Sequence, residues 1–370
     1  MKEKIESNAF LTEAYGSYDD LLSFCKHLPK IELHAHLNGS ISKETAIQLI
    51  DRKGDPSLAQ RWASTLEGWA NAASKLDDFF PLFKCIYEIT NNEEAITYAT
   101  IQTIGEFSDD GVTYLELRST PRPNLGTGMT KASYANAILK GIQSASKSHP
   151  STTVRLILSL DRRESTESCL DTVDLAIQLK NKTGLVVGID LCGPPTDGTA
   201  VVFAPAIKRA KESGLKVTLH AAEIQNIDTD TQNLLLTSPD RIGHGTFLNT
   251  HAKTHLLTSS TPIEICLTSN VLCKTVETYA QHHLQGLLFQ DHPVILCTDD
   301  KGVFGSSLSE EYAIAAATFQ LRKEDLYELS RRAVEFVFGS EECKRTLRNE
   351  WERFRQNNGI GKWTGWNRGV

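Results

Sequence analysis

The feature that most limits the fold of this chain is a regular alternation between short apolar runs and longer segments with helical spacing. From Lys30 onward, runs rich in Val, Ile and Leu recur, and each is followed by a segment whose apolar residues are spaced as on a helix face. This pattern is typical of repeated βα units. The runs are Ile31 to His36, Val112 to Arg118, Val154 to Leu160, Leu185 to Leu191, Lys216 to His220, Arg241 to Gly245, Ile263 to Leu267 and Val294 to Thr298.

Several of these runs are apolar on both faces. That suits strands of a parallel sheet with helices outside and packed side chains inside. Eight parallel strands can close on themselves, and 370 residues are within the usual length of such a barrel. The sequence therefore predicts an α/β fold of the TIM type, a (β/α)8 barrel.

Extra helices are expected after the first strand and at the C-terminus of this barrel. The predicted segments are Ser42 to Arg52, Leu76 to Ile89 and Asn92 to Asp109, then Leu308 to Phe319, Lys323 to Phe338 and Glu341 to Phe354. No linker, repeat or low-complexity tract divides the chain. We expect one domain over residues 1–370, with its core at about residues 28–354.

Composition favours a globular protein with a substantial core. Hydrophobic residues make up 40% of the chain and charged residues 23%, which is ordinary for a protein with a large core. The net charge of −7 is spread along the chain without a long run of one sign. A non-specific nucleic-acid or membrane surface is therefore disfavoured, whereas a local cluster of basic groups can still bind a small anion. We expect a monomer.

Cysteine usage and the N-terminus indicate a reducing compartment. The eight cysteines are scattered through predicted strands and helices with no Cys-x-x-Cys spacing, so we expect free thiols. Residues 1–15 are polar and charged, without an apolar segment of signal-peptide length, and no stretch approaches transmembrane length. We expect a cytoplasmic protein.

The strongest local motif is His34-Ala35-His36 in the first predicted strand. Side chains two positions apart on a strand point to the same side, so the two imidazoles can hold one metal ion. Alone the motif is weak, because such pairs more often lie on a surface or fill a core.

Further polar residues follow the ends of three other predicted strands. They are His220 and Glu223 at the fifth strand, His244 at the sixth, and Asp299 and Asp300 after the eighth. In a (β/α)8 barrel these ends open onto the one mouth where catalysis takes place. The alternative, solvated carboxylates and core histidines, requires several strands to end by chance on a residue suited to metal binding or proton transfer.

The residue types also fit a zinc site. Three neutral imidazoles and one carboxylate, from His34, His36, His220 and Asp299, suit Zn²⁺ and leave a position for water. Such a metal lowers the pKa of water toward neutrality. Glu223, His244 and Asp300 remain free to move protons and orient a substrate.

Five ordered motifs, from about Leu28 to Phe354, resemble those of the adenosine and adenosine monophosphate deaminase family of metal-dependent amidohydrolases. They are Leu28 to Ser40, Thr218 to Glu223, Arg241 to Gly245, Ser269-Asn270 and Cys297 to Asp300. The resemblance implies one zinc ion per chain, held by the four ligands named above.

The resemblance also implies roles for the remaining site residues. Glu223 would donate a proton to N1 of the purine, which favours attack at C6. His244 would act beside the activated water as base and electrostatic stabiliser. Asp300 would hydrogen-bond N7, and the backbone of Gly193 would contact N3.

Several details are most similar to the branch of this family that acts on N6-methyl-AMP. They include Asn38-Gly39-Ser40 after the metal pair, Asp161 to Arg163 after the third strand, and Lys301 to Phe304 after the aspartate pair. Arg118 to Arg122 end the second strand, where hydroxyls and an arginine can bind a 5′-phosphate. The implied substrate-binding residues are His36, Asn38, Tyr87, Ser119, Thr120, Pro121, Arg122, Asp161, Gly193, Glu223 and Asp300.

Two departures from the branch concern recognition rather than zinc chemistry. Cys192-Gly193-Pro194-Pro195 stands where the branch commonly has Ser-Gly-Asp-Pro, and Tyr87 stands where a substrate-contacting histidine is expected.

The resulting hypothesis is hydrolysis of N6-methyl-AMP to IMP and methylamine. The alternatives are an adenosine deaminase that needs a free 5′-hydroxyl, a non-catalytic barrel, and another metal hydrolase. The last predicts a second metal or a carboxylated lysine, and no lysine ends the fourth predicted strand.

Overall fold

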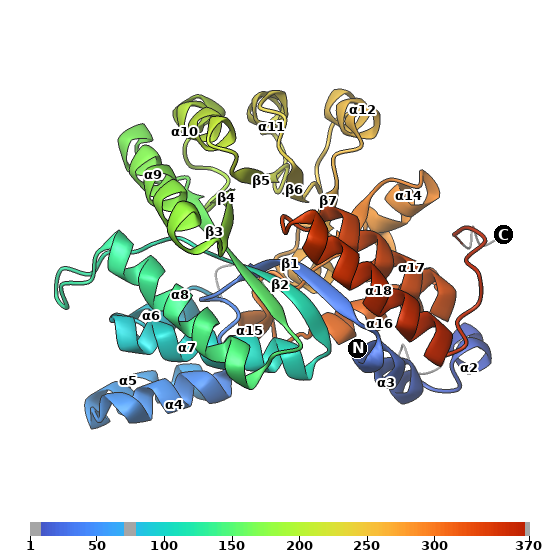
Figure 1. Ribbon diagram of the computed structural model, residues 1–370, viewed down its shortest axis with the longest axis horizontal. Coiled ribbons are helices and arrows are strands. Elements are labelled where there is room, and N and C mark those ends of the chain that lie inside the picture. Colours follow the sequence, from blue (N-terminus) through green and yellow to red (C-terminus); the bar gives the residue numbers. More distant parts are fainter. Residues whose placement is uncertain (1–8, 70–78, 367–370) are drawn as a thin grey trace.

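The computed structural model describes residues 9–69 and 79–366. Its centre is an eight-stranded parallel sheet whose strands follow one another in chain order. Helices surround the strands on the outside (Figure 1). The strands are β1 Lys30–His36, β2 Val112–Ser119, β3 Thr153–Asp161, β4 Val186–Cys192, β5 Lys216–Ala221, β6 Arg241–His244, β7 Ile263–Ile265 and β8 Val294–Leu296. The predicted (β/α)8 barrel is confirmed.

The barrel closes between β1 and the segment that follows β8. Ala35 and Asp299 form a parallel bridge there. The Asp299 amide donates to the His34 carbonyl at 2.8 Å, and the His36 amide donates to the Asp299 carbonyl at 3.0 Å. The backbone groups that close the barrel therefore belong to three of the predicted metal ligands, His34, His36 and Asp299.

The last two strands are shorter than the sequence predicts. β7 ends at Ile265, and helix α13 (Leu267–Leu272) begins two residues later. After β8, the backbone amide of Thr298 donates to the Glu32 carboxylate at 2.9 Å instead of to a neighbouring strand. A buried side chain therefore takes over a hydrogen bond that regular pairing would supply.

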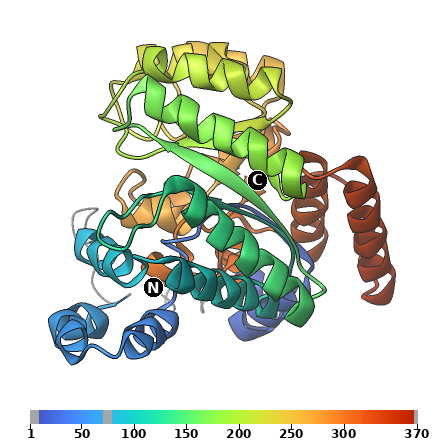
Figure 2. The same cartoon turned by 60° about the vertical axis from the view of Figure 1, so that its left-hand side comes forward.

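Each strand leads into helices that cover the barrel, as Figure 2 shows from a second direction. Side-chain caps explain several helix starts, because Asn92, Thr130, Ser165 and Asn249 each accept a hydrogen bond from a free amide of the first turn. The helices are α7 Glu93–Asp109, α8 Lys131–Ser148, α9 Thr166–Thr183, α10 Ala200–Glu212, α11 Asp228–Leu236, α12 Thr250–Ser259 and α14 Leu284–Phe289.

The insertion between β1 and α7 contains α4 Lys43–Lys53, α5 Pro56–Glu67 and α6 Phe80–Ile89. The sequence interpretation missed α5, although Asp55 caps its first turn and Leu58, Trp62 and Leu66 recur at helical spacing. Residues 76–78 of the predicted segment Leu76 to Ile89 lie outside the described residues.

These inserted helices share a second hydrophobic core with α15 (Lys301–Phe304), which directly follows the Asp299-Asp300 pair. The Trp69 indole donates to the Gly302 carbonyl at 2.8 Å. The rings of Phe79 and Phe304 meet edge to face at 5.0 Å between centroids. The insertion thus supports the segment that carries two predicted site residues.

Helices at both chain ends pack beside the barrel. α2 (Ala9–Ala14) and α3 (Tyr18–His27) were not predicted. The predicted C-terminal helices are present as α16 Leu308–Phe319, α17 Lys323–Ala333 and α18 Glu341–Asn357, with a 3-10 turn, η3, over Val334–Phe336. In the parts of the chain that the structure describes, no helix is long and apolar enough to cross a membrane.

Candidate metal and active site

The four predicted metal ligands converge at the carboxyl end of the barrel. His34 Nε2 and His36 Nε2 lie 3.3 and 3.4 Å from Asp299 Oδ1. His36 Nε2 is also 3.1 Å from His220 Nε2. Although β1, β5 and the segment after β8 are far apart in sequence, the barrel brings their side chains within range of one ion.

Hydrogen bonds behind the histidines indicate that a cation belongs between them. His34 Nδ1 is bound to Glu264 Oε2 at 2.8 Å, and His220 Nδ1 is bound to Asp190 Oδ1 at 3.0 Å. Each Nδ1 is therefore the donor, and the lone pair of each Nε2 points into the cluster. Within the described parts of the chain, the buried His34 Nε2 has no hydrogen-bond partner, although it lies beside a carboxylate oxygen. Facing lone pairs repel unless they share a positive ion.

The electrostatics of the cluster also favour a positive charge. Burial and the Arg118 charge lower the pKa of His34, but Asp299 and Glu264 outweigh them and raise it to about 9. Burial raises the pKa of Asp299, whereas His34 and His244 hold it well below its usual value. A divalent metal would replace the proton that the cluster otherwise attracts.

Among the residues that the structure describes, two overlapping groups of donor atoms are close enough to hold a metal. One comprises His34, His220, His244 and Asp299, and the other comprises His36, Asp190 and His220. The predicted ligand set takes members of both. His244 Nε2 is 3.9 Å from Asp299 Oδ2, so His244 lies beside the predicted ligands, where a proton acceptor for water is expected. Burial lowers the pKa of His244 to about 3, which keeps its imidazole neutral.

Strained backbone positions accompany the strand ends that carry the site. Ala222, His244 and Asp299 have φ angles of 54°, 62° and 63°, a region that residues other than glycine rarely adopt. All three lie at or just after the ends of β5, β6 and β8. Strain of this kind persists only where the surrounding fold stabilises it, and it is common at functional sites.

Glu223 and Asp300 lie beside the metal cluster, and their pKa values shift in the opposite direction to that of Asp299. Burial raises the pKa of Glu223. Burial and the neighbouring Asp299 raise the pKa of Asp300 well above its usual value. Asp300 Oδ1 is buried and has no hydrogen-bond partner among the described residues, and a Cβ on Gly39 would lie 1.6 Å from it. Gly39 is required there because any side chain would collide with Asp300.

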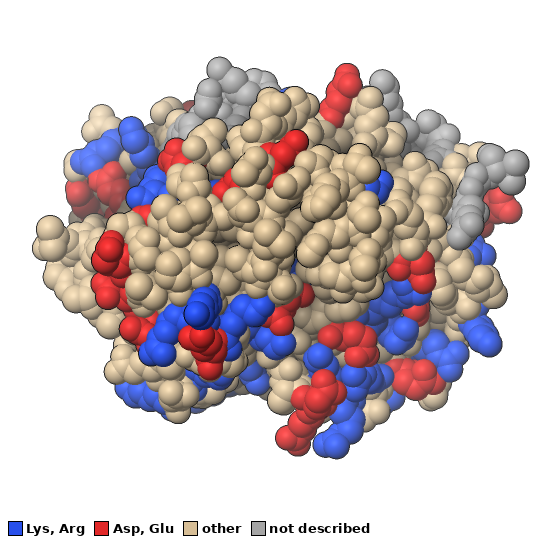
Figure 3. Space-filling model, turned by 90° about the horizontal axis from the view of Figure 1, so that it is seen from above, with Lys and Arg blue, Asp and Glu red and all other residues tan. Residues whose placement is uncertain are grey.

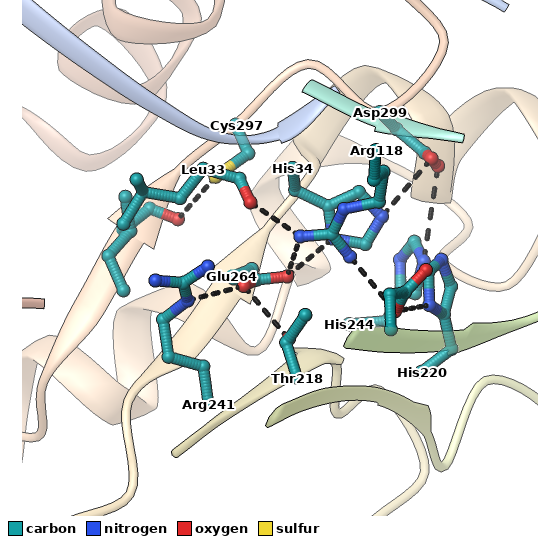
Figure 4. Close-up of polar contacts among 12 residues, drawn as sticks. Leu33, His34, Arg118, Thr218, His220, Arg241, His244, Glu264, Cys297 and Asp299 are labelled. Carbon is teal, nitrogen blue, oxygen red and sulfur yellow. Dashed lines mark hydrogen bonds and ion pairs between the residues drawn. The ribbon is translucent and has the colours of Figure 1, made fainter. Parts of the chain in front are cut away.

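Sequence reasoning missed the residues that hold the histidines in place. Asp190 and Glu264 are fully buried within the apolar strands β4 and β7. Figure 4 shows Glu264 facing His34 from inside the barrel. Ser269 donates to Asp299 Oδ2 at 2.7 Å, which orients this carboxylate in the same way. The signal that could have found the two carboxylates is a single acidic residue between apolar neighbours, as in Ile189-Asp190-Leu191.

The predicted phosphate-binding residues lie in the segment that follows β2. The Arg122 guanidinium stacks on the Tyr87 ring at 3.6 Å from its centroid. Among the residues that the structure describes, no carboxylate forms an ion pair with Arg122, so its charge remains free for an anionic ligand. Thr120 Oγ1 lies 3.5 Å from Cys192 Sγ, and Pro121 is buried beneath the segment.

Other predicted binding residues already have partners within the protein. The Asn38 Oδ1 oxygen accepts from Tyr134 at 2.9 Å, and the Ser119 hydroxyl is 2.9 Å from the Tyr134 hydroxyl. The Asp161 carboxylate binds the Arg163 side chain and backbone amide. Gly193 has a φ of 98°, and a Cβ there would lie 2.8 Å from Asp161 Oδ1. Glycine therefore leaves the backbone at this position accessible.

A scan against protein-family models matches residues 29–353 to the adenosine deaminase model. The chain belongs to the adenosine deaminase family. The proposed metal and proton-transfer residues all lie within the matched range.

Relatives within this family and their solved structures are similar over nearly the whole chain. The human N6-methyl-AMP deaminase is 42% identical, covering 90% of this chain and 95% of the relative. The apo structure of the N6-methyl-AMP deaminase from Arabidopsis thaliana matches with a TM-score of 0.83 and 38% identity, covering 91% and 99% of the two chains. A structure of Arabidopsis ADAL complexed with IMP matches with a TM-score of 0.82 and 38% identity, covering 90% and 99%.

Proposed function

We propose that this adenosine deaminase family member is a zinc-dependent hydrolase that acts at C6 of purine nucleoside monophosphates. The substrate that we infer is N6-methyl-AMP, and the products are IMP and methylamine. The observation that carries the proposal is the cluster of imidazole lone pairs and the Asp299 carboxylate at the barrel mouth, beside Glu223, His244 and Asp300. The names of the similar relatives support the choice of substrate.

The residues that we propose to hold zinc are His34, His36, His220 and Asp299. A bound Zn²⁺ would supply the Lewis acidity that activates water at neutral pH. The neutral His244 imidazole beside the site would accept a proton from that water. The donor set fits the metal because it combines three imidazoles with one carboxylate.

Three further residues would orient the purine and move a proton to it. Glu223 would donate a proton to N1, which draws electron density from C6 as water attacks. Asp300 would hydrogen-bond N7 through its unpartnered buried oxygen. Gly193 would offer its backbone to N3, and Asn38, Tyr87 and Asp161 would line the remainder of the substrate site.

The 5′-phosphate would bind to the segment after β2. Arg122 supports this proposal because its guanidinium is held on Tyr87 while its charge is not neutralised by a described carboxylate. Ser119 and Thr120 would add hydroxyl groups, and Pro121 would fix the backbone between these residues and Arg122. The solved relative with bound IMP is consistent with a nucleotide site.

A substrate panel on zinc-loaded protein tests the proposal. We expect kcat/KM to be highest for N6-methyl-AMP, and lower for AMP, adenosine and N6-methyladenosine. Arg122→Ala should reduce kcat/KM for N6-methyl-AMP by roughly ten- to a hundredfold, because a charge-assisted contact contributes about 1.5–3 kcal/mol. The same variant should change activity on N6-methyladenosine little, since that substrate has no phosphate.

Three outcomes would contradict the proposal in different ways. Equal or higher wild-type activity on the nucleoside would favour an adenosine deaminase and leave Arg122 without a role in binding. Equal losses on both substrates would indicate that Arg122 supports the fold rather than the phosphate. A zinc-loaded protein inactive on the whole panel would favour a non-catalytic barrel.

That the chain is one domain, a monomer and cytoplasmic stays a prediction.

A further inference from the structure

A fully buried arginine lies behind the metal cluster. Arg118 projects from β2 into the barrel, and its side chain is not exposed. Its Nη1 group donates to Asp190 Oδ1 at 3.2 Å, and its Nη2 group donates to Glu264 Oε2 at 2.8 Å. In Figure 4 the Arg118 guanidinium lies between the side chains of Glu264 and His220. Arg118 thus joins carboxylates from β4 and β7.

The two oxygen atoms that Arg118 binds are the same ones that hold histidine rings. Asp190 Oδ1 also accepts a hydrogen bond from His220 Nδ1 at 3.0 Å, and Glu264 Oε2 also accepts one from His34 Nδ1 at 2.8 Å. One rigid guanidinium therefore connects two chains of hydrogen bonds, and each chain ends at a predicted metal ligand. The planar fork of arginine fixes the separation of two acceptors, which the single ammonium of lysine does not.

Charge pairing also stabilises the two carboxylates of this network, Asp190 and Glu264. Buried carboxylates are costly unless they are paired and hydrogen-bonded. Arg118 lies between Asp190 and Glu264, whereas Arg241 pairs with Glu264 Oε1 at 2.7 Å and with Glu116 at 2.6 Å. Only Arg118, among the described arginines, contacts both carboxylates that face histidine rings.

We propose that Arg118 is a positioning residue that fixes the rings of His34 and His220 relative to each other for metal binding. The role rests on the proposed metal site, and it does not involve contact with the substrate. Without the fork, Asp190 and Glu264 would each orient one histidine, but no other described arginine would link the two carboxylates. Loss of this geometry should weaken zinc binding and lower kcat, while KM for the nucleotide changes little.

The decisive variant is Arg118→Lys, which keeps the charge and removes the fork. We expect its zinc affinity, measured by competition with a chromophoric chelator, to fall about 10- to 100-fold, as is typical when a group that orients a metal ligand is lost. The measurement needs no substrate. His220→Ala, which lacks a ligand, sets the lower limit of affinity, and circular dichroism reports whether each variant is folded.

Arg241→Lys is the matched control. This arginine is equally buried and holds the same Glu264, but through the oxygen that does not face His34, and it does not contact Asp190. It should lose stability while its zinc affinity stays within about threefold of wild type. Equal losses of affinity in the two lysine variants would overturn the specific role of Arg118.

Other outcomes separate the positioning role from the metal site itself. A folded Arg118→Lys protein with wild-type zinc affinity would overturn the role alone. A wild-type protein that binds no zinc would overturn the proposed function. If Arg118→Lys does not fold, the charge-balanced pair Arg118→Gln with Asp190→Asn is compared with Asp190→Asn, and equal zinc affinity of these two proteins would overturn the role.

Discussion

At the scale of single residues, neighbouring carboxyl groups of the site have pKa values shifted in opposite directions. Asp299 stays ionised because histidines surround it, whereas burial raises the pKa of Glu223 and of Asp300. Environment therefore separates three carboxyl groups that the sequence presents as equivalent. An ionised group suits metal binding, and a protonated one suits donation to a purine nitrogen.

Glu223→Gln should remove most turnover while the fold and zinc content survive. The amide has the size of the acid but delivers no proton to N1, and loss of a general acid costs on the order of 10²- to 10⁴-fold in rate. Zinc should be retained because Glu223 belongs to neither group of candidate metal donors.

Steady-state kinetics and metal analysis of Glu223→Gln and of the exposed control Glu212→Gln check this. Turnover of Glu223→Gln within a few-fold of wild type would rule out the acid role. Loss of zinc would instead show that Glu223 supports the metal site.

At the scale of elements, neighbouring helices brace the strand ends that carry the site. The Glu311 carboxylate on α16 accepts from the Thr268 amide in α13 at 3.1 Å, one residue before the Ser269 that orients Asp299. Burial raises the pKa of Glu311 to about 7. A group whose pKa is higher in the folded state stabilises the protein at low pH, and this contribution is lost as pH rises through the folded value.

Glu311→Gln should therefore flatten the pH dependence of stability. The wild type should lose about 3 kcal/mol relative to the variant between about pH 4.5 and pH 8, because a shift of one pKa unit corresponds to about 1.4 kcal/mol. The glutamine oxygen can still accept from the Thr268 amide, so the variant should fold.

Urea unfolding of both proteins at pH 5 and pH 8 provides the comparison for Glu311. If the difference in unfolding free energy between wild type and Glu311→Gln is the same at pH 5 and pH 8, Glu311 titrates normally in the folded protein.

At the scale of the whole molecule, the two ends of the barrel have different tasks. Site residues gather after the strand ends, whereas the C-terminal tail is attached near Asp291, before β8. Arg332 of α17 lies 4.8 Å from the Trp363 ring and 5.3 Å from the Trp366 ring. The tail thus packs against α17 and the segment that precedes β8, on the side of the strand starts, where residues of barrels serve stability.

The double variant Trp363→Ala and Trp366→Ala should lose roughly 2–3 kcal/mol of unfolding free energy, from partly buried ring area and two cation–π contacts. Its kcat/KM should equal that of wild type, because the tail is far from the mouth. Urea unfolding and kinetics of the pair are compared with Leu236→Ala, which removes an exposed side chain. Reduced activity at unchanged stability would contradict the division between the two ends.

Charge distribution is also a property of the whole molecule. On the face seen in Figure 3, basic and acidic side chains are interspersed and broad areas are uncharged. This face carries no large field of one sign, as the spread of charge along the sequence predicts. An anionic substrate would then be recognised by local groups such as Arg122 rather than by the field of the whole surface.

The sequence by itself determined the barrel and the candidate ligands. Apolar periodicity is a local property, and it identified all eight strands. The spacing of His34 and His36 placed both imidazoles on one side of β1, and the positions of His220, His244 and Asp299 at strand ends followed from the same periodicity. The α5 helix carried its own local signals at Asp55 and Leu58, and those signals were overlooked.

Only the tertiary structure decided which charges orient the site. Arg118 and Arg122 lie four residues apart in one motif, yet the first is buried among carboxylates and the second stacks on Tyr87 at the surface. Asp190 and Glu264 bind histidines because closure of the barrel brings β4 and β7 around Arg118. No local pattern encodes such pairings, since their hydrogen bonds join residues that are 30 to 230 positions apart.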